Sequence, residues 1–185
     1  MDNGDYTKYY DLGDYIFSEV HDRFHRQRFI DAFDFFCIII WKANRAKSKI
    51  AIKLKEKFPG KSLNDIAKKI SNGIFQAPTK KEKIKNLLED GLFRLPIASA
   101  ILSVFYPNEF TIFDYRVCQH PELRKYRYLS SCKLDRTIDG YIEFIETIKK
   151  LPIPGQSFRD KDKYLWSKSF CEDLEKDIKN EFSKK

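Results

Sequence analysis

The residues with the most chemical potential lie between Gly91 and Gln119. A turn at Gly91 leads into a predicted tight helix whose residues 98–100 are small, and a loop then presents the carboxylate of Asp114. Free backbone N–H groups at the start of a helix that follows a tight turn can bind an anion such as phosphate. Asp114 is also suited to capping the next helix, because its carboxylate can accept hydrogen bonds from backbone N–H groups.

A second distinctive stretch runs from Lys42 to Lys61 and holds eight basic residues against one acid, Glu56. Its spacing predicts an amphipathic helix that Pro59-Gly60 ends. The basic face can neutralise nucleic-acid phosphates or serve as a solvated surface. The face consists of Lys42, Arg45, Lys49 and Lys53, and the buried stripe one position on is Ala43, Ala46, Ile50, Leu54 and Phe58.

At these two stretches the chain resembles the helix-hairpin-helix DNA glycosylases, the group that includes endonuclease III and the adenine glycosylase. Their pattern L-P-G-V-G-x-x-T-A-x-x-x-L is followed, after a short interval, by an apolar pair and a catalytic Asp. Ala98–Leu102 matches the T-A-x-x-x-L helix, and Ile112-Phe113-Asp114 matches the apolar pair and the Asp. Upstream, FDFFCIIIWKANRAKSKIAIKLKEKF (Phe33–Phe58) is similar to the family's buried helix, turn and second helix. The resemblance covers residues 33–119.

The resemblance implies a compact, single all-α domain over 1–185, with the helix-hairpin-helix near 80–105 and flanking helices in 1–32 and 134–185. It implies a monofunctional DNA glycosylase that binds duplex DNA and hydrolyses the N-glycosidic bond of a damaged or modified base. The base would leave the stack, and Asp114 would stabilise the oxocarbenium-like transition state. The implied DNA-binding residues are Lys42, Asn44, Arg45, Lys49, Gly91 and Arg94, and Trp41 or Tyr115 would stack on the extruded base.

The chain departs from the family at the hairpin. Leu92-Phe93-Arg94 replaces G-V-G and leaves Gly91 alone for a close backbone approach to phosphate, although Arg94 could supply a direct charge contact. Pro96 stands where bifunctional members carry a Schiff-base lysine, so no lyase activity is expected. The four cysteines are far apart and form no CxxC pair, so neither a metal site, an iron–sulfur cluster nor another cofactor is expected.

Composition narrows the class of protein. A hydrophobic content of 42%, with 16 Phe and 10 Tyr, argues against disorder, and seven Gly and seven Pro are few for a β-sandwich or barrel. The net charge of +8 fits an anionic partner, and it equally fits a charged surface that keeps the protein soluble. The acidic N-terminus is no signal peptide, and the longest apolar run, Phe35–Trp41, is too short to span a bilayer. We therefore expect an intracellular monomer without membrane contact.

Hydrophobic periodicity predicts the remaining elements. The nearly uniformly apolar residues 33–41 predict a helix at the centre of the domain, and further helices are expected over 63–71, 79–89, 95–105, 135–151 and 158–182. Trp166 is expected in the core. Two alternatives to an active glycosylase stay open, a DNA-binding protein that has lost catalysis on the same fold and a protein-interaction module with an aromatic-rich surface.

Overall fold

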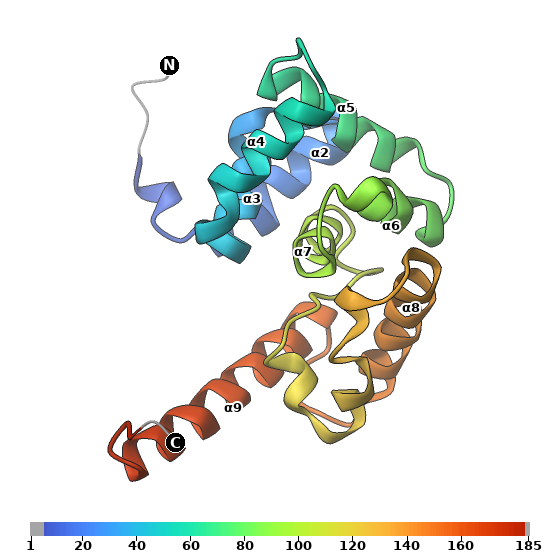
Figure 1. Cartoon of the computed structure of the whole chain (residues 1–185). Helices are drawn as coiled ribbons and strands as arrows, with labels where there is room; N and C mark the ends of the chain where they lie inside the picture. Colours follow the sequence, from blue (N-terminus) through green and yellow to red (C-terminus); the bar gives the residue numbers. More distant parts are fainter. Residues whose placement is uncertain (1–5, 184–185) are drawn as a thin grey trace.

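The computed structural model describes residues 6–183, and their regular structure is entirely helical (Figure 1). Short 3₁₀ or π turns join several helices, and no described residue forms a β-strand, so the all-α prediction is confirmed. No helix in this part of the chain is long and apolar enough to cross a membrane. The α-helices are α1 (Leu12–Tyr15), α2 (His21–Gln27), α3 (Ala32–Ala43), α4 (Lys47–Lys57), α5 (Leu63–Gln76), α6 (Lys80–Leu88), α7 (Leu95–Phe105), α8 (Leu134–Lys150) and α9 (Phe158–Lys179).

Helix α7 is the centre of the molecule. Each of its residues except Pro96 is buried, and α2, α3 and α6 all pack against it. Its small residues Ala98 and Ala100 let neighbouring helices approach closely. The helix predicted over 33–41 is confirmed as part of α3, whose Ile38 and Ile39 are fully buried, but α3 covers a side of the core and leaves the Phe33 side chain 56% exposed. A strongly apolar sequence did not distinguish a helix buried all round from one that covers a side of the core.

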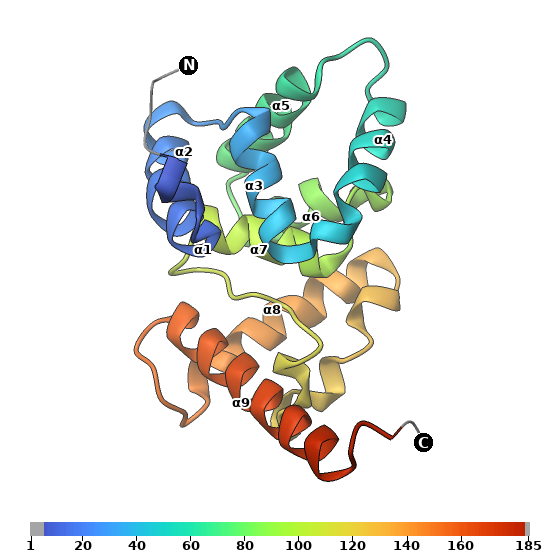
Figure 2. The ribbon, with the colours of Figure 1, turned by 90° about the vertical axis from the view of Figure 1, so that its left-hand side faces the viewer.

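The helices form two groups on either side of α6 and α7. Figure 2 shows α1–α5 on one side, α8 and α9 on the other, and the segment that follows α7 running between them. Buried apolar side chains from both groups belong to one continuous cluster, which extends from Tyr15 to Leu165. The segment after α7 thus lies between the two groups of helices.

Residues 80–105 form two helices joined by a tight turn, as expected. Thr79 and Glu82 form a reciprocal capping box that begins α6. The turn contains Gly91 with φ of +64°, a left-handed conformation that favours glycine, and the N–H of Phe93 donates to the carbonyl of Leu87 across the turn at 3.0 Å. The predicted helix 95–105 agrees with α7 at both ends.

The basic stretch does not form one helix. Helix α3 ends at Ala43, a 3₁₀ turn occupies Asn44–Ala46, and α4 begins at Lys47, which agrees with the helix, turn at Ala43-Asn44 and second helix that the resemblance implied. Lys42 therefore belongs to α3 and lies apart from the basic residues of α4, which corrects the prediction of a single stripe. Ile50 and Leu54 are buried as predicted, and Phe58 is partly buried.

Other predicted helices differ only at their ends. Helix α5 extends to Gln76, beyond residue 71, and α9 ends at Lys179, before residue 182. The Ser62 and Ser157 hydroxyls begin α5 and α9 with capping boxes.

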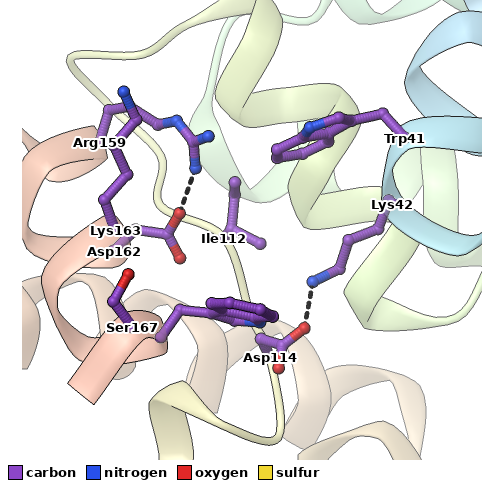
Figure 3. Close-up of a pocket in the computed structure, with 9 residues that line it drawn as sticks. Trp41, Lys42, Ile112, Asp114, Arg159, Asp162, Lys163 and Ser167 are labelled. Atoms are coloured by element: carbon purple, nitrogen blue, oxygen red, sulfur yellow. Dashed lines mark hydrogen bonds and ion pairs between the residues drawn. The ribbon is translucent and has the colours of Figure 1, made fainter. Parts of the chain in front are cut away.

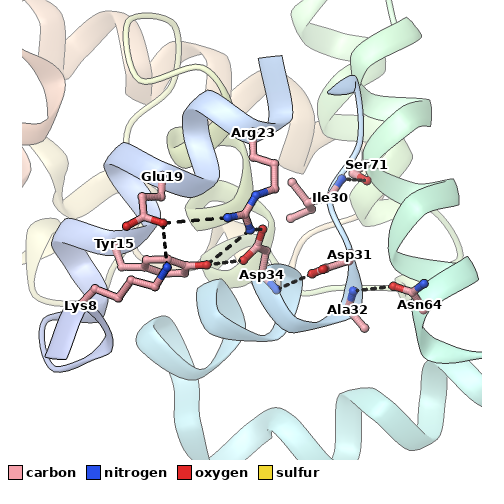
Figure 4. Close-up of polar contacts among 10 residues, drawn as sticks. All are labelled: Lys8, Tyr15, Glu19, Arg23, Ile30, Asp31, Ala32, Asp34, Asn64 and Ser71. Carbon is pink, nitrogen blue, oxygen red and sulfur yellow. Dashed lines mark hydrogen bonds and ion pairs between the residues drawn. The ribbon is translucent and has the colours of Figure 1, made fainter. Parts of the chain in front are cut away.

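A buried polar network fixes α3 against the N-terminal helices (Figure 4). The Tyr15 hydroxyl donates to Oδ1 of Asp34 at 2.7 Å, and Arg23 forms an ion pair with Oδ2 of the same carboxylate, which is fully buried. Burial and the hydrogen bond to Asp34 raise the pKa of Tyr15 well above its usual 10. The network orients α3, whose last turn carries two residues of the candidate site.

Candidate active site

A cavity of about 340 Å³ opens where the end of α3, the segment after α7 and the first turns of α9 meet. Its volume is at the lower end of the range for small-molecule pockets. Figure 3 shows Trp41 and Lys42 reaching into it from α3 and Asp162 and Arg159 from α9. The lining residues are Trp41, Lys42, Ile112, Asp114, Arg159, Asp162, Lys163, Trp166 and Ser167.

Helices α7 and α8 each anchor the segment that carries Asp114. The backbone N–H of Phe113 donates to the Ser99 hydroxyl of α7 at 2.9 Å, and the Tyr141 hydroxyl of α8 donates to the carbonyl of Thr111 at 2.6 Å. Both bonds are buried, so they are shielded from competition with water. The loop that was predicted to present Asp114 is thus a strip of backbone without regular structure that is fixed by α7 and α8.

Asp114 is held through both carboxylate oxygens. Its Oδ1 accepts from the backbone N–H of Arg116 at 2.9 Å, and its Oδ2 accepts from Nζ of Lys42 at 2.5 Å. The Lys42 side chain is only 9% exposed and that of Asp114 is 23% exposed. Asp114 therefore caps a turn, as an aspartate before a helix was expected to do, but only a 3₁₀ turn at Val117–Gln119 follows.

A second carboxylate lines the same cavity. Asp162 is buried, and its Oδ2 accepts from Nη1 of Arg159 at 2.5 Å. Burial raises the pKa of Asp162 to about 6, although the charges of Arg159 and Lys42 oppose the shift. The Arg159 guanidinium in turn lies over the Trp41 ring, 5.0 Å from its centroid, and 4.7 Å from the centroid of Phe17.

The aromatic residues differ from the predictions. Trp41 lines the cavity, in keeping with a stacking role. Tyr115 does not, because its ring is 53% exposed and its hydroxyl accepts from Arg127. Trp166, expected in the core, is 41% exposed, lines the cavity and stacks on Phe170. The periodicity placed Trp166 on an apolar stripe, but α9 projects beyond the core and leaves that stripe partly uncovered.

The remaining predicted DNA-binding residues lie outside the cavity. Asn44, Arg45 and Lys49 are exposed at the turn and on α4, and Arg94 is exposed at the N-cap of α7, where its side chain makes no capping bond. The Lys53 ammonium of α4 donates to the carbonyl of Gly91. That contact brings α4 and the hairpin turn together, so two separately predicted basic elements are neighbours.

Sequence reasoning did not identify the contribution of α9. Arg159, Asp162, Lys163 and Trp166 recur at steps of three and four, which places them on one face of the helix. This mixture of charged and aromatic residues on one face was the available signal, but only the tertiary structure shows that the face meets Asp114.

Among the described residues, no group of three or more His, Cys, Asp or Glu side chains is arranged to hold a metal ion. No protein-family model matches the chain, and searches of curated proteins and of solved structures found no match either.

Proposed function

We propose that this protein is a DNA glycosylase that hydrolyses the N-glycosidic bond of a damaged or modified base. The observation that carries the proposal is the cavity in which the carboxylate of Asp114 and two tryptophans come together beside the hairpin helix α7. The resemblance over 33–119 supports the same reaction class. Asp114 would supply the carboxylate, and the cavity would receive the base.

The position of Asp114 suits electrostatic stabilisation of a cationic sugar. Both of its oxygens are fixed by hydrogen bonds, so little reorganisation would be needed as positive charge develops at C1′. Trp41 and Trp166 supply aromatic surface on which an extruded base can stack. On this proposal the exposed basic residues of α4 and the hairpin would bind the flanking phosphates.

The proposal is tested with Asp114→Asn on duplexes that carry a panel of modified bases. Asn caps a turn about as well as Asp, and its amide oxygen can still accept from Lys42. Loss of the counter-charge of the nearly buried Lys42 should lower stability, so the fold of the variant is checked by circular dichroism, and duplex binding should change little. The amide lacks the negative charge, so base release should fall by about 10²–10³-fold or more. Base release is measured by chromatography and binding by fluorescence anisotropy. Equal rates for the two proteins would refute the catalytic role of Asp114.

The panel also separates the alternative functions. Salt-dependent duplex binding with no release of any base would make the chain a non-catalytic DNA-binding protein. Absence of DNA binding would leave the protein-interaction module. A positive result would in addition identify the base, which neither the sequence nor the cavity specifies.

A bifunctional glycosylase with lyase activity is the second candidate, favoured by the 2.5 Å contact between Lys42 and Asp114. The proline at position 96 removes only the hairpin lysine. In this mechanism Asp114 takes a proton from Lys42, the neutral amine attacks C1′, and the base leaves with the electron pair of the C–N bond. The departing base takes up a proton from solvent. The C1′–O4′ bond then breaks, O4′ takes a proton from the lysine nitrogen, and the electron pair of that N–H bond forms a protonated imine, which would permit elimination of the 3′ phosphate.

Borohydride trapping decides between the two mechanisms. Hydrolysis without an amine nucleophile, which we propose first, predicts no covalent adduct between wild-type protein and substrate DNA. A trapped adduct that disappears in Lys42→Gln but persists in Lys80→Gln would establish the bifunctional mechanism instead. Lys80 is a suitable control because it does not line the cavity.

A further inference from the structure

The two carboxylates of the cavity are not equivalent. Both oxygens of Asp114 accept hydrogen bonds, from Lys42 and from the backbone of Arg116. Asp162 accepts through Oδ2, from Arg159, and no hydrogen bond to its Oδ1 is found among the described residues. Asp162 lines the cavity, and Figure 3 shows its carboxylate directed toward the interior. One carboxylate is therefore fully held, and the other has an oxygen left to bind a water molecule.

We propose that Asp162 is the general base that activates the water in glycosidic hydrolysis, an inference that rests on the proposed glycosylase function. Oδ1 of Asp162 takes a proton from the water while the water oxygen bonds to C1′. The C1′–N bond breaks, and its electron pair leaves with the base, which takes up a proton from solvent. Asp162 then returns its own proton to solvent. Asp114 keeps its charge throughout and stabilises the sugar cation.

The surroundings of Asp162 suit this role. Arg159 on α9 and Lys42 on α3 favour its ionised form, whereas Asp114 on the intervening segment and burial favour the protonated form. Tyr141 on α8 is a further titratable neighbour, and burial and the charge of Asp162 raise its pKa well above 10, so it stays neutral. The effect of burial prevails and raises the pKa of Asp162 to about 6. A general base is most effective when its pKa is close to the working pH, so this value suits proton transfer near neutral pH.

A purely structural role for Asp162 makes a different prediction. If its only task were to hold Arg159 over Trp41, an isosteric amide would do so, because the amide oxygen still accepts from the guanidinium. The rate of base release would then survive Asp162→Asn. A general base, in contrast, cannot be replaced by an amide, which has no basic oxygen near neutral pH.

The test uses single-turnover base release on a substrate found with the lesion panel. Asp162→Asn should lower the rate by about 10²–10⁴-fold. The wild-type rate should fall about tenfold per pH unit below pH 6, as Asp162 takes up its proton, and this dependence should be absent from the residual activity of the variant. Asp177→Asn, an exposed site on the same helix, is the matched control and should behave as wild type.

A binding measurement separates this inference from the proposed function. A duplex with a cationic pyrrolidine in place of the sugar mimics the developing positive charge, and a neutral tetrahydrofuran duplex does not. Asp114→Asn should lose the preference for pyrrolidine, whereas Asp162→Asn should keep most of it while losing base release. Wild-type base release that Asp162→Asn retains would overturn the role of Asp162 alone. Failure of the wild type to release any base would overturn both proposals.

Discussion

At the scale of single residues, the cavity combines groups that stabilise the fold poorly. Asp162 is a buried carboxylate whose neutral form the protein favours, and Lys42 is a nearly buried ammonium whose charge is balanced by one partner. Burial of charged groups is costly, and it is a frequent feature of sites at which chemistry requires an altered proton affinity. Asp162 and Lys42 line the same cavity as two tryptophans. This combination favours a functional role for the cavity over a purely structural one.

Burial of the Asp162 carboxylate lowers the stability of the folded protein, and this effect can be measured as a dependence of the free energy of unfolding on pH. Its pKa rises from an ordinary 3.8 to about 6 in the folded protein, so the folded state binds more protons than the unfolded state between these values. The stability contributed by this group therefore falls as pH rises through that window. Two pKa units correspond to about 3 kcal/mol, an upper limit for the effect.

We therefore predict that Asp162→Asn is more stable than wild type at pH 8, by about 1–3 kcal/mol in the free energy of unfolding. The advantage should shrink as pH falls and disappear near pH 3, below both pKa values, where the wild-type carboxyl is mostly protonated in both states. Urea unfolding at the two pH values measures the difference. Lower stability of the variant at pH 8 would mean that the ion pair with Arg159 outweighs the cost of burial.

At the scale of elements, helices were predictable wherever a periodic apolar stripe coincided with a local end signal. Helix α7 was predicted at both ends because Pro96 fits its first turn and Pro107 follows it. The position of Asp114 after the apolar pair Ile112-Phe113 was also recognisable. Each of these features depends on residues close together in the sequence.

What the sequence could not supply were the features set by tertiary packing. The helical spacing of the basic residues runs on through the break at Asn44–Ala46, so periodicity alone did not separate Lys42 from α4, although the resemblance implied a turn at Ala43-Asn44. Nothing in α9 indicates that Asp162 and Trp166 lie beside Asp114, because the contact joins segments far apart in the chain. The half of the site contributed by α3 and the segment after α7 was therefore predictable, and the half contributed by α9 was not.

At the scale of the whole molecule, charge is divided unevenly. Residues 1–34 contain eight acidic and four basic residues, whereas the exposed face formed by α4 and the turn before it is basic. The contact between Lys53 and Gly91 joins this face to the hairpin, whose Arg94 is also exposed. The exposed basic residues therefore belong to two elements in contact, α4 and the turn before α7, rather than to the single stripe predicted from the sequence.

The salt dependence of DNA binding tests this surface. Each neutralised phosphate contributes about −0.9 to the slope of log K against log salt. The double reversal Arg45→Glu and Lys49→Glu should therefore make the slope shallower by about 1.8 and weaken binding on all sequences alike, because phosphate contacts carry no sequence information. Fluorescence anisotropy with two unrelated duplexes over a range of salt concentrations provides the measurement.

The matched control is the double reversal Arg136→Glu and Lys150→Glu. Both residues are exposed on α8, and no residue of this helix lines the cavity or belongs to the turn before α7. Both double variants lower the net charge of the protein by the same amount, so an effect of overall charge would appear equally in the two. A surface contact specific to α4 would appear only in the first. Equal slopes for the two variants would show that DNA does not bind at α4, and the DNA-binding surface proposed here would have to be sought elsewhere on the molecule.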